Sequence, residues 1–128
     1  MTKSILLVGV GGQGTILASK ILTLGLMEAG FDVKMSEIHG MSQRGGSVSS
    51  QVRYGDVVYS PVIEKGSADI IVSFEKMEAL RALDYLKEGG VLVVNDEEID
   101  SMSVITGQEE YPDDVLDIIK SHSKATVL

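Results

Sequence analysis

The stretch ILLVGVGGQGT, residues 5–15, decides the fold of this 128-residue chain. Its first four residues are a continuous run of branched apolar side chains, which is typical of a strand buried on both faces of a parallel sheet. The glycines that follow have the spacing G-x-G-x-x-G, which provides a tight turn and lets backbone N–H groups approach an anion. Residues 15–29 then have the broad apolar surface of a helix, and Gly30 ends it. The stretch therefore predicts a strand, a loop and a helix.

The rest of the chain continues this alternation, with one interruption. Residues 31–36 predict a second strand, which completes a βαβ unit. Residues 47–54 and 57–59 alternate apolar and polar side chains around Gly55 and Asp56, which predicts a β-hairpin. Further strands are predicted at residues 68–74, 91–95 and 125–128, and further helices at 76–86 and 113–122. The predicted fold class is α/β: a Rossmann-like, three-layer fold whose mostly parallel sheet carries an inserted β-hairpin.

Two details of this prediction concern the second half of the chain. The apolar residues of the helix at 76–86 recur at helical spacing, which places Glu75, Glu78 and Arg81 on its outer side. Residues 87–90 are expected to end that helix and turn the chain. The sequence stops inside the last predicted strand, whereas a doubly wound sheet normally has helices on both faces. We therefore expect residues 1–128 to be a single domain that is truncated at its C-terminus or completed by a partner.

Composition and charge exclude several classes of function. The chain has no Cys, so it has no disulfide scaffold, no thiolate nucleophile and no cysteine-held iron–sulfur cluster or zinc. Its net charge of −8 argues against a nucleic-acid binder. No apolar run approaches the ~20 residues that span a bilayer, and no signal-peptide pattern is present. We expect a cytoplasmic protein that binds neither nucleic acid nor membrane.

The charge is distributed unevenly along the chain. Residues 1–60 carry a net charge of +1, whereas residues 61–128 carry −9. The favoured interpretation of the acidic half is a solvated surface. The alternative is an acidic face that contacts a basic partner.

The glycine loop has two interpretations. Dinucleotide binding would require an acidic residue at the end of the second strand, where it binds the ribose. Glu37, 23 residues after Gly14, is the only candidate, and it lies at the start of the next loop. This favours a tight strand–helix turn without bound NAD or FAD. A free-standing NAD(P)- or FAD-binding oxidoreductase and a non-catalytic nucleotide-sensing module are the alternative functions.

A second loop, residues 37–46, follows neither the helix period nor the strand period. His39 has three interpretations: a general acid or base, a ligand contact, or a loop residue held by hydrogen bonds. Arg44 offers a planar donor fork to a phosphate or carboxylate, and the alternative is a salt bridge to Glu37. Both loops follow early strands of the sheet, at the edge where open α/β sheets bind ligands. We expect Gln13 and Arg44 to face one crevice.

The histidines and the paired acidic residues are the candidate metal ligands, and neither set supports a metal site. The only histidines are His39 and His122, which lie in different predicted elements. The paired acids lie in loops or helix starts, where acidic residues cap helices. These pairs are Glu97-Glu98, Glu109-Glu110 and Asp113-Asp114. We predict no metal site in this chain.

Four motifs together resemble a known family. They are GVGGQGT at residues 9–15, SEIHGMSQRGGSV at 36–48, YSPVI at 59–63 and GSAD at 66–69. In this combination the chain resembles the gamma-type domain of 2-oxoacid:ferredoxin oxidoreductases, most of all that of the indolepyruvate and pyruvate enzymes. The resemblance runs from about residue 4 to residue 95. Family members generally continue beyond the equivalent of Leu128, which agrees with the expected truncation.

The resemblance implies a subunit of an enzyme that uses thiamine diphosphate and iron–sulfur clusters. Such an enzyme oxidatively decarboxylates a 2-oxoacid, makes an acyl-CoA and passes electrons to ferredoxin. The clusters and the thiamine diphosphate sit on other domains or subunits, and the gamma-type domain packs against them and helps to form the coenzyme A side of the active site. A chain without Cys agrees with this division of labour. We expect it to bind no cofactor tightly and to be inactive alone.

The resemblance also assigns site residues, none of them catalytic or metal-binding. The first loop would provide backbone and polar contacts, and the second loop would position or gate the ligand at a subunit interface, with Arg44 contacting a phosphate of coenzyme A. These residues are Gly9, Gly11, Gly12, Gln13, Gly14 and Thr15 in the first loop, and His39, Gln43, Arg44, Gly45 and Gly46 in the second.

Overall fold

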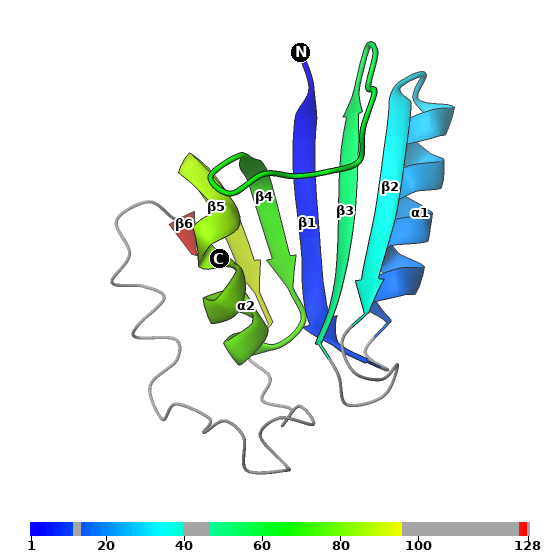
Figure 1. Cartoon of the computed structure of the whole chain (residues 1–128). Helices are drawn as coiled ribbons and strands as arrows, with labels where there is room; N and C mark the ends of the chain where they lie inside the picture. Colours follow the sequence, from blue (N-terminus) through cyan, green and yellow to red (C-terminus); the bar gives the residue numbers. More distant parts are fainter. Residues whose placement is uncertain (12–13, 40–46, 96–125, 128) are drawn as a thin grey trace.

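The computed structural model describes residues 1–11, 14–39, 47–95 and 126–127 (Figure 1). They form a six-stranded sheet in the order β2-β3-β1-β4-β5-β6. The strands are β1 (Lys3–Val10), β2 (Asp32–His39), β3 (Ser47–Gly55), β4 (Ala68–Ser73), β5 (Leu86–Val94) and β6 (Thr126–Val127). The helices are α1 (Thr15–Glu28) and α2 (Lys76–Ala82), and a short 3-10 helix, η1 (Leu83–Tyr85), follows α2 directly.

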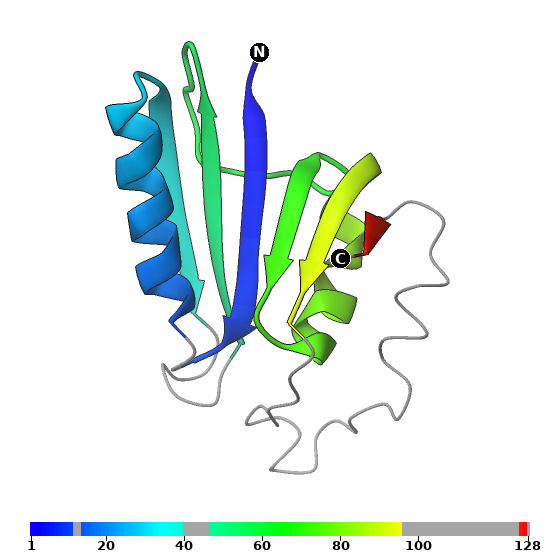
Figure 2. The same cartoon turned by 180° about the vertical axis from the view of Figure 1, so that it is seen from behind.

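The sheet is mostly parallel and has a helix on each face. Strands β1, β4, β5 and β6 pair in parallel, and β3 is antiparallel to both of its neighbours. Helix α1 packs over β2 and β3, whereas α2 packs on the opposite face over β1 and β4, as the two views in Figures 1 and 2 show. The predicted three-layer α/β fold is confirmed.

Strand β1 is buried on both faces. Because successive strand residues point to opposite sides, Leu6 and Val8 join the core under α2, together with Ile71. Ile5 and Leu7 join the core under α1. A continuous apolar run is the sequence that a central strand between two helical layers requires.

The prediction that residues 57–59 form the second strand of a hairpin is wrong. Strand β3 alternates buried and partly buried residues as expected, but it pairs with β2 on one side and with β1 on the other. Both of its edges are therefore occupied, and residues 57–59 have no strand to join. They are irregular: the Val58 N–H donates to the Asp32 carboxylate at 2.8 Å, and Tyr59 is exposed. The inserted antiparallel pair consists of β2 and β3.

The turn predicted at residues 87–90 is also wrong, because these residues lie inside β5. Helix α2 ends at Ala82, four residues earlier than the predicted end. The pairing of β5 with β4 shifts in register between Ala68 and Ile70, which marks a bulge in the strand. Gly89, with φ +79°, supplies the left-handed backbone conformation at this bulge.

Some sequence predictions lie outside the described residues, namely the helix at 113–122 and the paired acids. Within the ranges described above, no helix is long and apolar enough to cross a membrane. The same ranges contain no group of three or more His, Cys, Asp or Glu side chains placed to hold a metal ion.

A partly buried carboxylate joins three strands at the amino edge of the sheet. Asp69 at the start of β4 accepts hydrogen bonds from the Ser4 N–H of β1 at 2.8 Å and from Lys87 Nζ of β5 at 2.6 Å. Burial raises the pKa of Asp69, but the hydrogen bonds and charge of Lys87 and the Ser4 N–H outweigh it, so the pKa lies below its usual value. The ionised carboxylate therefore stabilises the fold.

Replacing Asp69 with Asn is expected to lower the free energy of unfolding at pH 7 by about 1.5 kcal/mol, because a charge-assisted hydrogen bond is lost. Since the pKa is lower in the folded state, this contribution is present above the unfolded value of about 3.9 and disappears as the pH falls through the folded value. Urea unfolding at pH 7 and pH 3 measures both effects. Asp56→Asn is the control, because that side chain is 95% exposed. Equal losses for Asp69→Asn at the two pH values would contradict the assignment.

Candidate ligand site at the carboxyl edge of the sheet

The first glycine loop ends in a helix start with a left-handed backbone. Gly14 is the N-cap residue of α1 and has φ +89°, a conformation that glycine adopts without a steric penalty. It offers no side chain to cap the helix, and no acidic residue lies in the first turn. The N–H groups of that turn and the positive end of the helix dipole therefore remain available to an anion.

Thr15, the first residue of α1, has a buried hydroxyl with an unmet hydrogen bond. It is 3% exposed, and its Oγ1 has no hydrogen-bond partner in the part of the chain that the structure describes. A buried polar group without a partner costs free energy. A ligand oxygen at the helix start would remove that cost.

The sheet register brings the two predicted loops to the same edge. Val48 of β3 pairs with Gly9 of β1 on one side and with His39 of β2 on the other. The chain therefore leaves β1 and β2 at neighbouring points of the carboxyl edge. Of the predicted site residues, Gly9, Gly11, Gly14 and Thr15 are described, and His39 is described in its backbone only. The others lie outside the described residues: Gly12, Gln13, Gln43, Arg44, Gly45 and Gly46.

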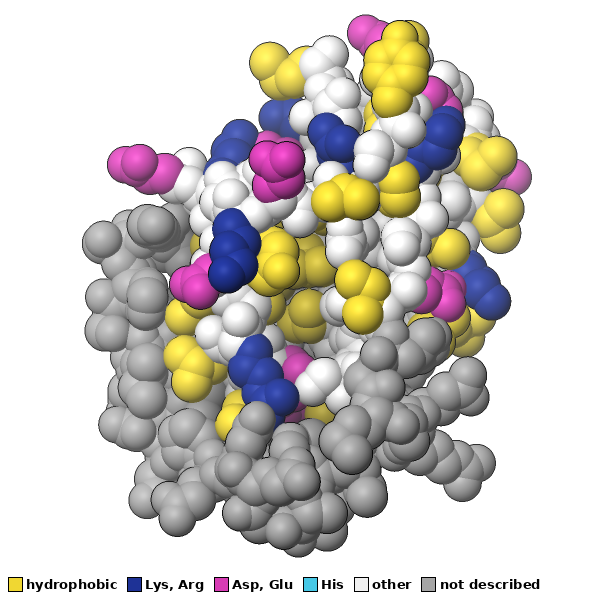
Figure 3. All heavy atoms as spheres, viewed as in Figure 1, with side chains coloured by type: hydrophobic (Ala, Val, Ile, Leu, Met, Phe, Trp, Pro, Cys, Tyr) yellow, Lys and Arg dark blue, Asp and Glu magenta, His cyan; other side chains and the backbone are white. Residues whose placement is uncertain are grey.

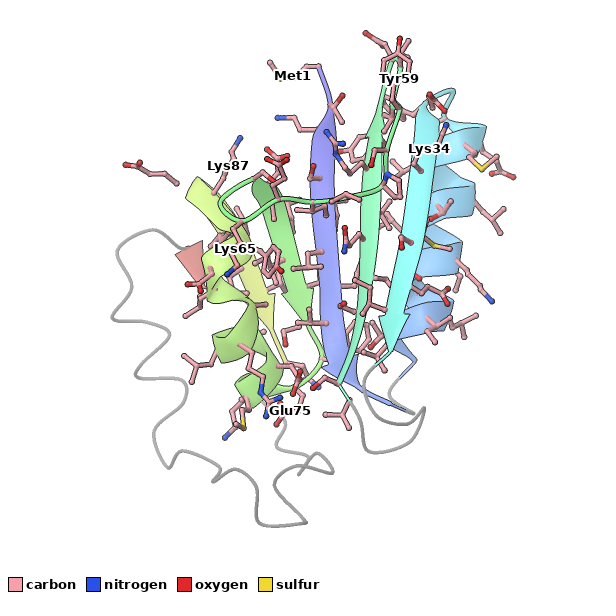
Figure 4. All side chains as sticks on the ribbon, in the orientation of Figure 1. Met1, Lys34, Tyr59, Lys65, Glu75 and Lys87 are labelled. Carbon is pink, nitrogen blue, oxygen red and sulfur yellow. The ribbon has the colours of Figure 1, made fainter. Side chains whose placement is uncertain are left out.

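Two acidic residues at this edge are buried, contrary to the sequence prediction. Glu75 lies just after β4, at the edge opposite Lys87 and Met1 in Figure 4, and is fully buried. Its Oε1 accepts a hydrogen bond from the Glu78 N–H at 2.9 Å and so caps α2. Glu78 is 5% exposed. Glu is not among the preferred N-cap residues, so the sequence carried no clear signal for this cap.

The acidic pair is linked to β3 by Arg81. Arg81 Nε lies 3.6 Å from Glu78 Oε2, and its Nη1 donates to Ser47 Oγ at 3.3 Å. Arg81 is exposed, as the sequence predicted, and its guanidinium bridges α2 to the start of β3. Ser47 is the first residue of β3, where the chain returns from the second loop. Helix α2 is thereby tied to the strand that separates the two predicted loops.

A cavity of about 320 Å³ opens between α2 and β3 beside this cluster. Figure 3 shows this face, with hydrophobic side chains in the hollow. The cavity is lined by apolar Leu6, Val8, Ile38, Val48, Ala82 and Tyr85 and by polar Ser47, Ser49, Gln51, Glu78 and Arg81. An apolar floor with a few polar groups is the usual composition of a small-molecule site.

The strand order does not favour dinucleotide binding. In the Rossmann fold of dinucleotide-binding proteins, the acidic residue that binds the ribose lies at the tip of the strand next to β1. Here β3 separates β1 from β2, which puts β2 two inter-strand spacings, about 9.5 Å, away. Glu37 lies inside β2, paired with Ser50, and not at the strand tip.

Known proteins share both the sequence and the fold of this chain. Residues 4–126 match the family described as pyruvate ferredoxin/flavodoxin oxidoreductase. The indolepyruvate oxidoreductase subunit IorB of Pyrococcus horikoshii is 46% identical over 109 residues, which cover 85% of this chain and 54% of that subunit. The chain thus spans about half the length of this relative.

Solved structures repeat the fold. The pyruvate oxidoreductase subunit PORC of Thermotoga maritima superposes with a TM-score of 0.62 and 22% identity, over 86% of this chain and 57% of that one. The 2-oxoglutarate:ferredoxin oxidoreductase of Magnetococcus marinus, solved with 2-oxoglutarate, coenzyme A and succinyl-CoA, superposes with a TM-score of 0.69 and 17% identity, over 98% of this chain and 19% of that one. With the family match over nearly the whole sequence, the chain belongs to the pyruvate ferredoxin/flavodoxin oxidoreductase family.

Proposed function

We propose that this chain is a small, cluster-free subunit of a 2-oxoacid:ferredoxin oxidoreductase, packs against a larger catalytic subunit and forms the coenzyme A side of its active site. The 46% identity to an indolepyruvate oxidoreductase subunit supports indolepyruvate as the 2-oxoacid. The observation that carries the proposal is the carboxyl edge, where the glycine loop and the second loop leave adjacent points of the sheet. The chain is then inactive alone, because the reacting centre belongs to the partner.

The residues present fit coenzyme A but not the redox groups. Iron–sulfur clusters need Cys ligands, and these 128 residues have none, so the proposal assigns the clusters, and the thiamine diphosphate, to the partner. Coenzyme A carries phosphates. The start of α1 suits an anion because Gly14, at the N-cap, has no side chain that would bond the N–H groups of the first turn. At the same place, Thr15 Oγ1 is a buried donor that has no partner among the residues the structure describes.

The chain's own contribution is binding and orientation. The backbone of Gly9, Gly11 and Gly14 lets a phosphate approach the sheet edge, and the first-turn N–H groups donate to it. Arg44 adds a charged donor fork to the same phosphate. Coenzyme A supplies the thiol that accepts the acyl group on the partner. The remaining loop residues position the ligand at the interface: Gly12, Gln13, His39, Gln43, Gly45 and Gly46.

Co-expression tests the proposal. The tagged chain is produced with a candidate large oxidoreductase subunit from the same organism, and the complex is isolated without oxygen. We expect a complex that contains iron and reduces ferredoxin with indolepyruvate and coenzyme A, whereas neither subunit alone does so. Isolation of the chain without that partner, or tight binding of NAD(P) or FAD to the chain, would refute the proposal.

Replacing Thr15 with Val is expected to separate stability from ligand binding. The buried hydroxyl has no partner in the described part of the chain, so its loss leaves the free energy of unfolding unchanged or raises it by up to about 1 kcal/mol. The KM for coenzyme A in the assembled enzyme rises about threefold, because one hydrogen bond to the ligand is lost. Thr23→Val is the control, since its hydroxyl donates to the Ser19 carbonyl within α1. An unchanged KM in Thr15→Val would show that the hydroxyl does not contact the ligand.

A further inference from the structure

Helix α1 has two apolar faces, and only one of them is packed. Its inner residues Ala18, Leu22 and Leu26 lie against the sheet. Its outer side carries four large apolar side chains that are between 56% and 63% exposed, and we name them the α1 outer stripe: Leu17, Ile21, Leu24 and Met27. Figure 2 shows α1 lying across this face of the sheet. Four large apolar side chains on the outer side of one helix are more than a packed inner face requires, which indicates a second contact.

Gly25 gives a second, independent indication of a contact on this helix. It lies inside α1, its φ is not positive, and a Cβ added to it would meet no atom within 4 Å. Neither the backbone conformation nor the packing of the described residues therefore requires glycine there. Glycine inside a helix is about 1 kcal/mol less favourable than Ala. A second backbone that approaches the helix closely at this position would require it.

We propose that the α1 outer stripe inserts into an apolar groove on the larger catalytic subunit, with the groove wall passing over Gly25. This inference rests on the proposed function. Anchors at i, i+4 and i+7, here Leu17, Ile21 and Leu24, are the spacing by which a helix docks in a groove. Lys20 and Glu28 lie on the same face as the stripe, since each is four residues from Leu24, and their opposite charges leave this face neutral overall. Leu17 lies in the first turn, so a subunit bound there also reaches the glycine loop.

The size of the stripe favours a groove over a second copy of this chain. Helix α1 has 14 residues and is about 21 Å long and about 10 Å wide. Two such convex faces in contact cover far less than the roughly 800 Å² per partner of a standard interface. A groove encloses the sides of the helix as well as its crest, which increases the area buried by the same four side chains.

Binding of the chain to the isolated catalytic subunit tests the inference. We expect Leu24→Glu to raise the Kd at least tenfold. Gly25→Ala should raise the Kd severalfold while it raises the Tm of the free chain by about 3–5 °C, since Ala favours the helix. Val62→Glu is the matched control, because Val62 is 58% exposed but lies outside α1. It should bind like the original chain.

The outcomes distinguish this inference from the proposed function. If the original chain binds the catalytic subunit and Leu24→Glu binds equally well, the docking face is wrong and the proposed function stands. If light scattering shows that the chain alone is a dimer that Leu24→Glu dissociates, the stripe takes a second copy and the inference is overturned. If the original chain does not bind at all, both fail.

Discussion

Replacing Gly14 with Ala is expected to raise the KM for coenzyme A roughly tenfold in the assembled enzyme, which corresponds to about 1.4 kcal/mol of lost binding. Gly14 has φ +89° at the N-cap of α1, where its lack of a side chain leaves the first-turn N–H groups accessible. An L-residue in this conformation costs about 1–2 kcal/mol. The helix start can relieve that strain only by rotating the N–H groups away from the anion. Steady-state kinetics with coenzyme A as the varied substrate measure the change.

Gly30→Ala is the matched control for this experiment. Gly30 follows the other end of α1, has φ +96°, and an added Cβ there meets no atom within 4 Å, as at Gly14. The two variants should therefore lose similar free energies of unfolding, for the same backbone reason. Only Gly14→Ala should change the KM. Equal KM values in the two variants would remove the start of α1 from the coenzyme A site.

The sequence predicted well those strands whose burial follows from the pattern of their own consecutive residues. Residues 5–8 are apolar without interruption because β1 is covered by α1 on one face and by α2 on the other. The glycines after it predicted the turn into α1, and Gly14 does adopt a conformation that favours glycine. The three-layer fold follows from these local signals.

The pairing of β3 could not be predicted in the same way. The alternation in residues 47–54 indicates a strand with two different faces, and this strand exists. Its hydrogen-bond partners, however, are β1 and β2, and β1 lies more than 35 residues earlier in the chain. The nearest alternating segment, residues 57–59, was taken as the partner because proximity in sequence is the only guide that alternation provides.

The site was predicted only in part for a related reason. Glycine loops have a sequence signature, whereas the burial of an acidic residue depends on what covers it. Glu75 and Glu78 are charged residues beside an apolar helix stripe, which normally indicates a solvated face. They are buried because α2 begins at the crowded carboxyl edge, against the ends of β1 and β4. Neither the cap nor the burial is written in their spacing.

Replacing Glu75 with Ala is expected to lower the free energy of unfolding by about 2–4 kcal/mol, the sum of a lost helix cap and a cavity. Glu75 is fully buried, and its Oε1 is the acceptor for the Glu78 N–H. Without it, that N–H loses its partner at a buried helix start. Urea denaturation monitored by circular dichroism measures the loss. Glu64→Ala, at an exposed position, should stay within about 0.5 kcal/mol of the original chain.

Glu75→Gln separates the cap from the charge. Gln keeps the size of the side chain and an oxygen that accepts from the Glu78 N–H, but it carries no charge. If the cap and the packed volume provide the stabilisation, Glu75→Gln loses less than half of what Glu75→Ala loses. If Gln and Ala are equally damaging, the buried charge itself is required, as expected for a carboxylate paired with a cation.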